Sequence, residues 1–111
     1  MRQQAFCALN ALGKIPVLVC PDCQSICEPL AITAHLLEVF PTLAPPGGSA
    51  ARAQHWQCLA MLITCIYSAH HRQHRTEYYA PETAYCAVRR LAVDEQMPAY
   101  DFIEETLCPF L

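Results

Sequence analysis

The sequence predicts a mostly helical α+β protein, and three observations lead to this fold class. Two short runs, 15–19 (IPVLV) and 24–27 (QSIC), flank a turn-like segment and predict a β-hairpin. A proline- and glycine-rich stretch, 42–49 (TLAPPGGS), predicts a linker. Residues 50–111 then carry apolar side chains at helical spacing. We therefore expect a hairpin-containing part over 1–41, a linker, and a helical part.

The hairpin is expected to lead directly into a helix. Cys23 stands in the turn, where glycine is the usual residue. Pro29 suits the first turn of a helix, because the missing N–H of proline costs nothing there. Apolar residues at helical spacing follow over 30–39, and Pro41 is expected to end the helix.

The helical part contains two long helical patterns. The first runs from 50 to about 75 and is apolar almost all round, which predicts packing on several sides within a bundle. Its main stripe consists of Trp56, Leu59, Ile63, Tyr67 and His70. The second pattern starts near Pro81. Its expected inward residues are Tyr85, Val88, Leu91 and Ala92. Pro98 is expected to kink or split this helix, because an interior proline removes a hydrogen bond and clashes with the preceding turn.

Composition and charge exclude several classes of protein. The chain has 111 residues, 54% hydrophobic and 15% charged, which indicates a globular rather than a disordered protein. A net charge of -3 argues against a general nucleic-acid binder, since phosphate binding needs a positive surface. The longest apolar run, 58–67, is too short for a membrane span of ~20 residues, and no secretory signal is evident. We expect a cytoplasmic protein without nucleic-acid or membrane partners. Its eight cysteines are then expected to be reduced thiols, metal ligands or small buried hydrophobic residues rather than a disulfide framework.

Four segments follow the order and spacing of a known family. They are ALNALGKIPVLV (8–19), ICEPLAITAHLLEVFP (26–41), ARAQHWQCLAMLITCIYSA (51–69) and IEETLCPFL (103–111). Together they resemble the glutathione S-transferase family. The resemblance implies that 1–41 is the end of a thioredoxin-like, glutathione-binding domain and that 50–111 begins an all-α C-terminal domain. Complete relatives are usually homodimers that conjugate glutathione to electrophiles, a detoxification reaction, so glutathione is the expected substrate and no metal is expected.

The resemblance also implies where glutathione would bind. In the family, the proline at the position of Pro16 follows a cis peptide bond, and the backbone of the preceding residue, here Ile15, pairs with the cysteinyl part of glutathione like an added strand. The residue at the position of Glu28 meets the γ-glutamyl ammonium group. Pro29 stands where the family has a serine that binds the glutathione carboxylate. Since proline lacks both donors of that serine, we expect weak carboxylate binding.

The same residues also have plainer interpretations. Pro16 suits an ordinary trans proline at the start of an edge strand, because only about 5–6% of X-Pro bonds in folded proteins are cis. Glu28 suits the first turn of a helix, where a negative charge interacts favourably with the helix dipole. Tyr67 falls where family members often line the electrophile pocket, and its plainer role is that of a core aromatic.

No catalytic residue can be assigned from the resemblance. Family members stabilise the glutathione thiolate with a serine, tyrosine or cysteine near the first strand. The segment that carries this residue would precede Ala8. Relative to complete relatives the chain is therefore expected to be truncated at both ends, with weak or absent transferase activity on its own. The sequence leaves open whether the chain is itself an enzyme.

A small zinc-binding hairpin is a further hypothesis. Four soft ligands lie near one another in the sequence: Cys20, Cys23, Cys27 and His35. They could suit tetrahedral zinc, but their spacing is shorter than in common zinc motifs. A redox role for the CPDC pair is disfavoured, because the pair sits in a turn and not at a helix N-terminus. His70 and His74 are four apart on a helix and could share a metal, although a solvated helix end is the favoured interpretation.

A non-catalytic protein-interaction module is the alternative from a different functional class. A two-stranded hairpin without sheet neighbours exposes a strand edge and uncovered apolar faces. Such a surface could pair with a partner protein or with a second copy of the chain.

Overall fold

The computed structural model describes residues 2–107 and divides into two compact units, Met1–Pro46 and Gly47–Leu111. The division falls inside the proline- and glycine-rich stretch. Each unit is described separately below. The last four residues of the segment 103–111, which contributed to the family resemblance, lie outside the described residues.

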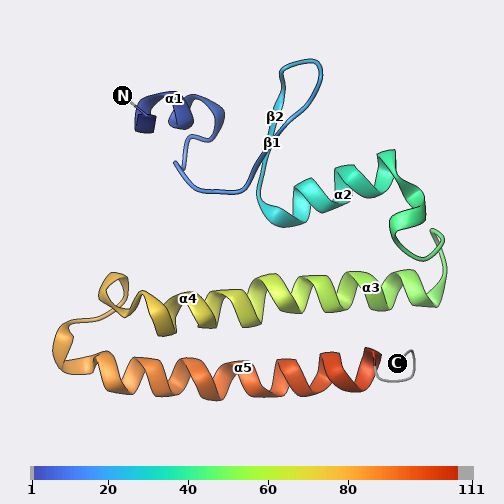
Figure 1. Cartoon of the computed structure of the whole chain (residues 1–111). Helices are drawn as coiled ribbons and strands as arrows, with labels where there is room; N and C mark the ends of the chain where they lie inside the picture. The colour runs from blue at the N-terminus through green and yellow to red at the C-terminus, as the bar shows by residue number, and fades with distance from the viewer. Residues whose placement is uncertain (1, 108–111) are drawn as a thin grey trace. The chain divides into compact units, whose positions relative to one another are not determined.

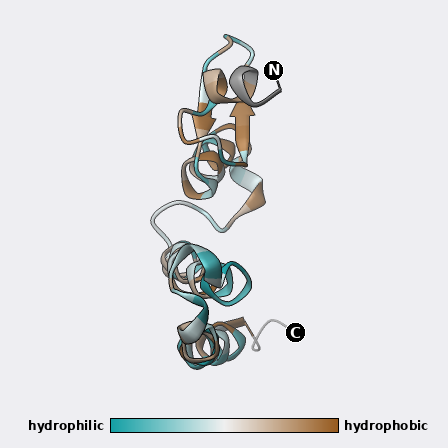
Figure 2. Ribbon diagram, turned by 90° about the vertical axis from the view of Figure 1, so that its left-hand side faces the viewer, coloured by the Kyte–Doolittle hydropathy of each residue, from teal (hydrophilic) through white to brown (hydrophobic). Residues whose placement is uncertain are grey.

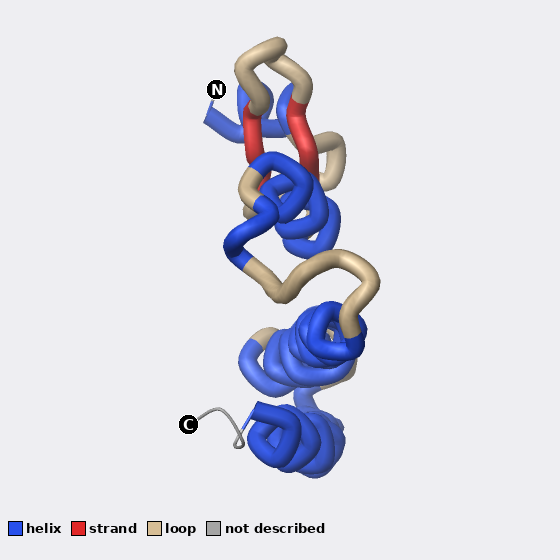
Figure 3. Tube along the Cα trace, turned by 90° about the vertical axis from the view of Figure 1, so that its right-hand side faces the viewer, coloured by secondary structure: helices blue, strands red, loops and turns tan. Residues whose placement is uncertain are grey.

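The first unit contains a β-hairpin followed by a helix, as the sequence predicts. Its elements in chain order are α1 (Arg2–Leu9), β1 (Val17–Val19), β2 (Ser25–Cys27), α2 (Pro29–Val39) and a 3-10 turn, η1 (Pro41–Leu43). The two strands lie side by side (Figures 1 and 3). They are antiparallel, with Leu18 opposite Ile26. Pro29 occupies the first turn of α2, where we expected it. Helix α1 was not anticipated from the sequence.

The hairpin turn is built by Cys20 to Gln24. The Cys23 N–H donates to the Cys20 carbonyl at 2.9 Å, and the Cys20 N–H donates to the Gln24 carbonyl at 2.8 Å. Cys23 has a φ of 66°, in the left-handed region that favours glycine. The turn therefore has the backbone that glycine usually provides, although a cysteine stands there.

Apolar surface remains uncovered in the first unit. Figure 2 shows both strands in the brown of hydrophobic residues. Within residues 2–107, β1 and β2 pair only with each other, so each strand has an unpaired edge. Large apolar side chains of this unit that are exposed to solvent include Ile15, Val19, Val39, Phe40 and Leu43. The expected open edge and uncovered apolar surface are both present in the described part of the chain.

The second unit is a helical hairpin. A continuous helical segment is formed by α3 (Ala50–Met61), a π-helical segment η2 (Leu62–Tyr67) and α4 (Ser68–His74). Two 3-10 turns, η3 (Thr76–Tyr78) and η4 (Glu82–Ala84), reverse the chain, and α5 (Tyr85–Leu107) returns along η2 and α4 (Figure 1). The fold is thus mostly helical with one antiparallel hairpin, which confirms the predicted class.

The packed face of the helical hairpin differs from the predicted stripe. The buried apolar residues of this unit are Cys58, Ile66, Ala69, Ala92 and Ala99. Tyr67 and His70, predicted on the main stripe, are exposed, and Leu91, predicted to face inward, is 66% exposed. The prediction was wrong at Tyr67 and His70 because a segment that is apolar almost all round has no single face that periodicity can select. It was wrong at Leu91 for a different reason: Ala92 is buried, and adjacent residues of a helix with 3.6 residues per turn point in different directions.

Pro98 neither splits nor ends the last helix. Helix α5 is unbroken over 23 residues with Pro98 inside it. Because proline has no backbone N–H, the carbonyl of Asp94 does not receive its usual hydrogen bond within the helix. Both residues are exposed, so water can hydrate that carbonyl and the helix can continue. None of the helices over residues 2–107 has the length and apolar character needed to cross a membrane.

Candidate functional site

Asn10 organises the loop that leads into the hairpin. Its side chain is buried, its amide donates to the Lys14 carbonyl, and its Oδ1 accepts from the Leu12 N–H at 3.0 Å. The Gly13 N–H donates to the Asn10 carbonyl at 2.8 Å, and Gly13 has a φ of 61°, which glycine adopts without steric cost. The loop is therefore held from inside by one buried amide.

Ile15 is presented to solvent at the end of this loop. Its side chain is 81% exposed, and β1 begins two residues later at Val17. The Ile15–Pro16 peptide bond is cis, as the family resemblance implied.

Glu28 lies at the turn from β2 into α2. It is the N-cap residue of α2, its φ is 72° and its ψ 128°, and its side chain makes no capping hydrogen bond. A non-glycine residue in this sparsely populated region costs on the order of 1–3 kcal/mol, and such residues cluster at functional sites. Glu28 is also exposed, so its carboxylate is accessible from solvent.

The strand register brings the predicted glutathione-binding residues to one end of the hairpin. Val17 is the partner of Cys27. Pro16 precedes Val17 and Glu28 follows Cys27, so both lie just beyond this last pair, and Ile15 and Pro29 come one residue further. Chemically, this end offers the backbone polar groups of Ile15 and one carboxylate. Pro29 has no N–H to offer to an anion at the start of α2.

The proposed zinc ligands do not converge. The Cys27 Sγ donates to the Leu9 carbonyl at 3.5 Å, next to the Ser25 Oγ, which donates to the same carbonyl at 2.8 Å. Cys23 is exposed in the turn. Over residues 2–107, no three or more histidine, cysteine or acidic side chains are grouped so that they could hold a metal. The zinc hypothesis therefore lacks a ligand set in this part of the chain.

Two of the four proposed zinc ligands, Cys20 and His35, are in contact with each other. The Cys20 Sγ lies 3.8 Å from the His35 Nε2, which joins the end of β1 to the middle of α2. Sequence spacing could not single out this pair from the other combinations of cysteines and histidine. Asn10 was also missed, although an asparagine shortly before a glycine is a signal for a side-chain-stabilised turn.

Tyr67 and the histidines lie in the second unit. Tyr67 ends η2, is 61% exposed, and has its ring centroid 6.4 Å from that of His71. The plainer role of a core aromatic is therefore wrong, and its electrophile-pocket role stays a prediction. The rings of His70 and His74 lie 4.2 Å apart, but no third metal ligand is grouped with them among the described residues.

Comparison with known proteins identifies the fold. No protein-family model matches the chain, and no curated protein matches it. Among solved structures, it is similar to a crystal structure of a glutathione transferase from Methylococcus capsulatus strain Bath, with 26% sequence identity and a TM-score of 0.70. The match covers 92% of this chain and 48% of that transferase. The chain therefore has a glutathione-transferase-like fold and spans about half the length of the transferase that it matches.

Proposed function

We propose that the chain is a glutathione transferase-like protein and that the α2 end of its hairpin binds glutathione. One observation carries the proposal: Glu28 is exposed, holds a positive φ at the start of α2, and shares its end of the hairpin with Ile15 and Pro16. The structural likeness to a glutathione transferase supports this choice of ligand.

Each residue of this end has a chemical role in the proposal. The backbone N–H and C=O of Ile15 pair with the cysteinyl part of glutathione, as in strand addition. The Glu28 carboxylate accepts charge-assisted hydrogen bonds from the γ-glutamyl ammonium group. Pro16 fixes the backbone of the loop, and Pro29 leaves the glutathione carboxylate without the donor that a serine would supply. We therefore propose that glutathione binds weakly. The proposed site uses no metal.

The proposed reaction class is conjugation of glutathione to electrophiles. Tyr67, exposed on η2, is proposed to contact the electrophile. Since Pro29 weakens the proposed glutathione binding, we propose that the chain alone has weak or absent transferase activity. A cytoplasmic location and homodimer formation, as in complete relatives, are part of the same proposal.

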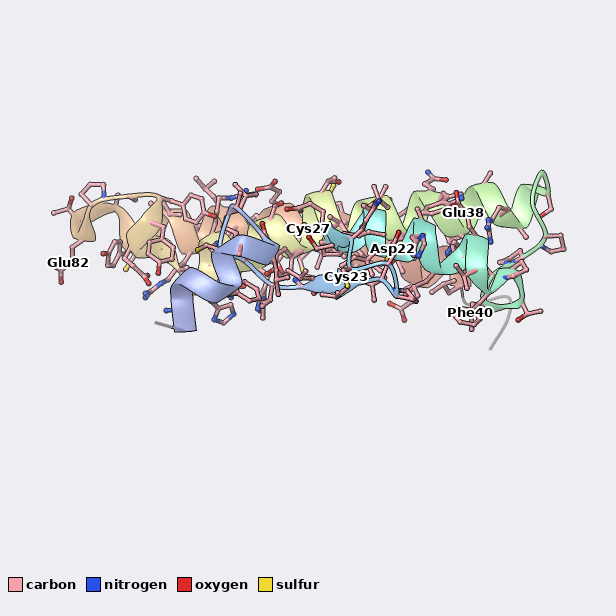
Figure 4. All side chains as sticks on the ribbon, turned by 90° about the horizontal axis from the view of Figure 1, so that it is seen from above. Asp22, Cys23, Cys27, Glu38, Phe40 and Glu82 are labelled. Atoms are coloured by element: carbon pink, nitrogen blue, oxygen red, sulfur yellow. The ribbon has the colours of Figure 1, made fainter. Side chains whose placement is uncertain are left out.

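Retention on immobilised glutathione tests the proposed binding site. Glu28→Gln keeps the size of the side chain and removes its charge, and we expect it to lose retention, because a hydrogen bond to a charged group contributes roughly 1.5–3 kcal/mol. Glu38→Gln is the matched control, since Glu38 is exposed near the other end of α2 (Figure 4). Equal retention of the two variants and the wild type would contradict the proposal.

A non-catalytic interaction module is the second candidate. It is favoured by the unpaired strand edge and by the exposure of Ile15 and Val19 on the hairpin. Size measurement in solution distinguishes it: a monodisperse dimer that unfolds cooperatively and is not retained on glutathione would favour the module over the transferase-like site.

A further inference from the structure

The turn end of the hairpin carries a cysteine beside a histidine. Cys20 follows the last residue of β1, and its Sγ lies 3.8 Å from the Nε2 of His35. Both residues are half-buried. An imidazole nitrogen within contact of a thiol can accept its proton, which is the arrangement that activates nucleophilic cysteines. The contact lies wholly within the first unit.

A second thiol lies in the same turn. The Cys23 N–H donates to the Cys20 carbonyl at 2.9 Å, which closes a four-residue turn. The end residues of such a turn have Cα atoms less than about 7 Å apart. A disulfide usually joins Cα atoms about 4.4–6.8 Å apart. Cys23 is exposed and is labelled with its neighbour Asp22 in Figure 4.

We propose that Cys20 is a reactive thiol that exchanges with low-molecular-weight disulfides, with His35 as its base and Cys23 as the resolving thiol. The sequence disfavoured a redox role because this pair has no helix N-terminus to activate a thiol, and the His35 contact supplies that activation instead. The proposal does not rest on glutathione binding at Glu28, because the two features occupy opposite ends of the hairpin. Val17 pairs with Cys27 at the Glu28 end, and Val19 pairs with Ser25 at the turn end.

The exchange proceeds in two balanced steps. His35 takes the Cys20 proton, and the Cys20 sulfur attacks one sulfur of the small disulfide; a mixed disulfide forms and one small thiolate leaves. The deprotonated Cys23 sulfur then attacks the Cys20 sulfur, so that a Cys20–Cys23 disulfide forms and the second small thiolate leaves. The protein loses two electrons and two protons, and the small disulfide becomes two small thiols.

Exposure alone predicts a different order of reactivity. Cys7, Cys23 and Cys86 are exposed, whereas Cys20 is only half-buried. If accessibility decided the rate, these exposed thiols would react before Cys20. The histidine contact predicts that Cys20 reacts first.

Mapping the modified cysteines tests the first step. The reduced chain is treated briefly with glutathione disulfide, quenched, and analysed by peptide mass spectrometry. We expect Cys20 to be modified first, and His35→Gln to slow Cys20 by roughly a hundredfold or more, as expected for loss of a general base. Cys86 serves as the internal control, and its rate should stay unchanged. Earlier modification of Cys7 or Cys86, or a Cys20 rate unaffected by His35→Gln, would overturn the proposal.

The second step has its own measurement. At completion the wild type should contain a Cys20–Cys23 disulfide, whereas Cys23→Ser should accumulate the mixed disulfide on Cys20. Repeating the reaction with cystine in place of glutathione disulfide should give the same products, because only disulfide chemistry is required. A wild type that retains the mixed disulfide on Cys20 would refute Cys23 as the resolving thiol.

Discussion

Cys23 and Glu28 both hold a positive φ without being glycine, and they do so at opposite ends of one strand. Cys23 has a φ of 66° in the hairpin turn, and Glu28 has a φ of 72° at the start of α2. The left-handed conformation costs a residue such as Cys23 about 1–2 kcal/mol, and the sparsely populated conformation of Glu28 costs on the order of 1–3 kcal/mol. Glu28 adopts its unfavourable backbone conformation at the proposed glutathione site, where its carboxylate is accessible. Cys23 adopts its unfavourable conformation in the hairpin turn, where it carries a thiol.

The turn position gives a stability prediction. Cys23→Gly is expected to raise the free energy of unfolding by about 1 kcal/mol, because glycine adopts this φ without the steric cost of a side chain. Chemical denaturation of the reduced chain measures the difference. Cys86→Gly is the control: it introduces glycine into the exposed first turn of α5 and should destabilise the chain by roughly 0.5–1 kcal/mol. Lower stability of Cys23→Gly than of the wild type would contradict the assigned backbone strain.

The residue after Glu28 gives a prediction of gained binding. Pro29→Ser restores a hydroxyl and an N–H at the start of α2. Recovery of one charge-assisted hydrogen bond of roughly 1.5–3 kcal/mol corresponds to about ten- to hundredfold tighter glutathione binding. Isothermal titration calorimetry measures the change, with Pro29→Ala as the control that restores the N–H without the hydroxyl. Unchanged affinity in both variants would show that the glutathione carboxylate does not reach this position.

At the scale of the elements, a buried polar network stabilises the second unit where the chain turns from α4 toward α5. Thr76 is fully buried, and its hydroxyl lies 2.9 Å from the Arg72 carbonyl and 3.1 Å from the Gln73 carbonyl. The Arg89 Nε donates to the same hydroxyl at 3.2 Å. The buried Gln96 amide donates to Gln73 Oε1 at 3.2 Å. The network thus ties α4 and η3 to α5.

Removal of the central hydroxyl should be costly. Thr76→Val keeps the shape of the side chain but leaves the Arg89 Nε without this acceptor, so we expect destabilisation of about 1–3 kcal/mol. Thr106→Val is the matched control, because the Thr106 hydroxyl is half-buried and donates to the Phe102 carbonyl of its own helix at 2.7 Å. Denaturant unfolding of both variants measures the difference, and an equal effect at the two positions would argue against the network.

Local signals in the sequence predicted the hairpin and α2, because prolines and turn residues restrict the backbone within a few positions. The buried face of the segment 50–75 was not predictable in the same way. This segment is apolar almost all round, and which of its side chains are buried depends on where α5 packs against it. The expected split of the helix at Pro98 was wrong because the solvent exposure of this residue, which permits the helix to continue, depends on tertiary packing. At the candidate site, the resemblance supplied Ile15 and Glu28, whereas the contact of Cys20 with His35 depends on how α2 packs against β1.

At the scale of the whole molecule, the chain combines two compact units in a glutathione-transferase-like fold. It spans about half the length of the transferase that it matches. The proposed glutathione-binding residues belong to the first unit, and Tyr67 belongs to the second. Glutathione binding can therefore be tested on the first unit's residues within the full chain, independently of any role of Tyr67.

The most direct test is a titration of glutathione into the isotopically labelled chain, followed by amide NMR. The account predicts dose-dependent shifts of the Ile15 and Glu28 amides, with the Glu38 and Glu82 amides unchanged under reducing conditions. The shifts should disappear in Glu28→Gln. Shifts confined to other positions, or none at millimolar glutathione, would contradict the proposal that this end of the hairpin binds glutathione.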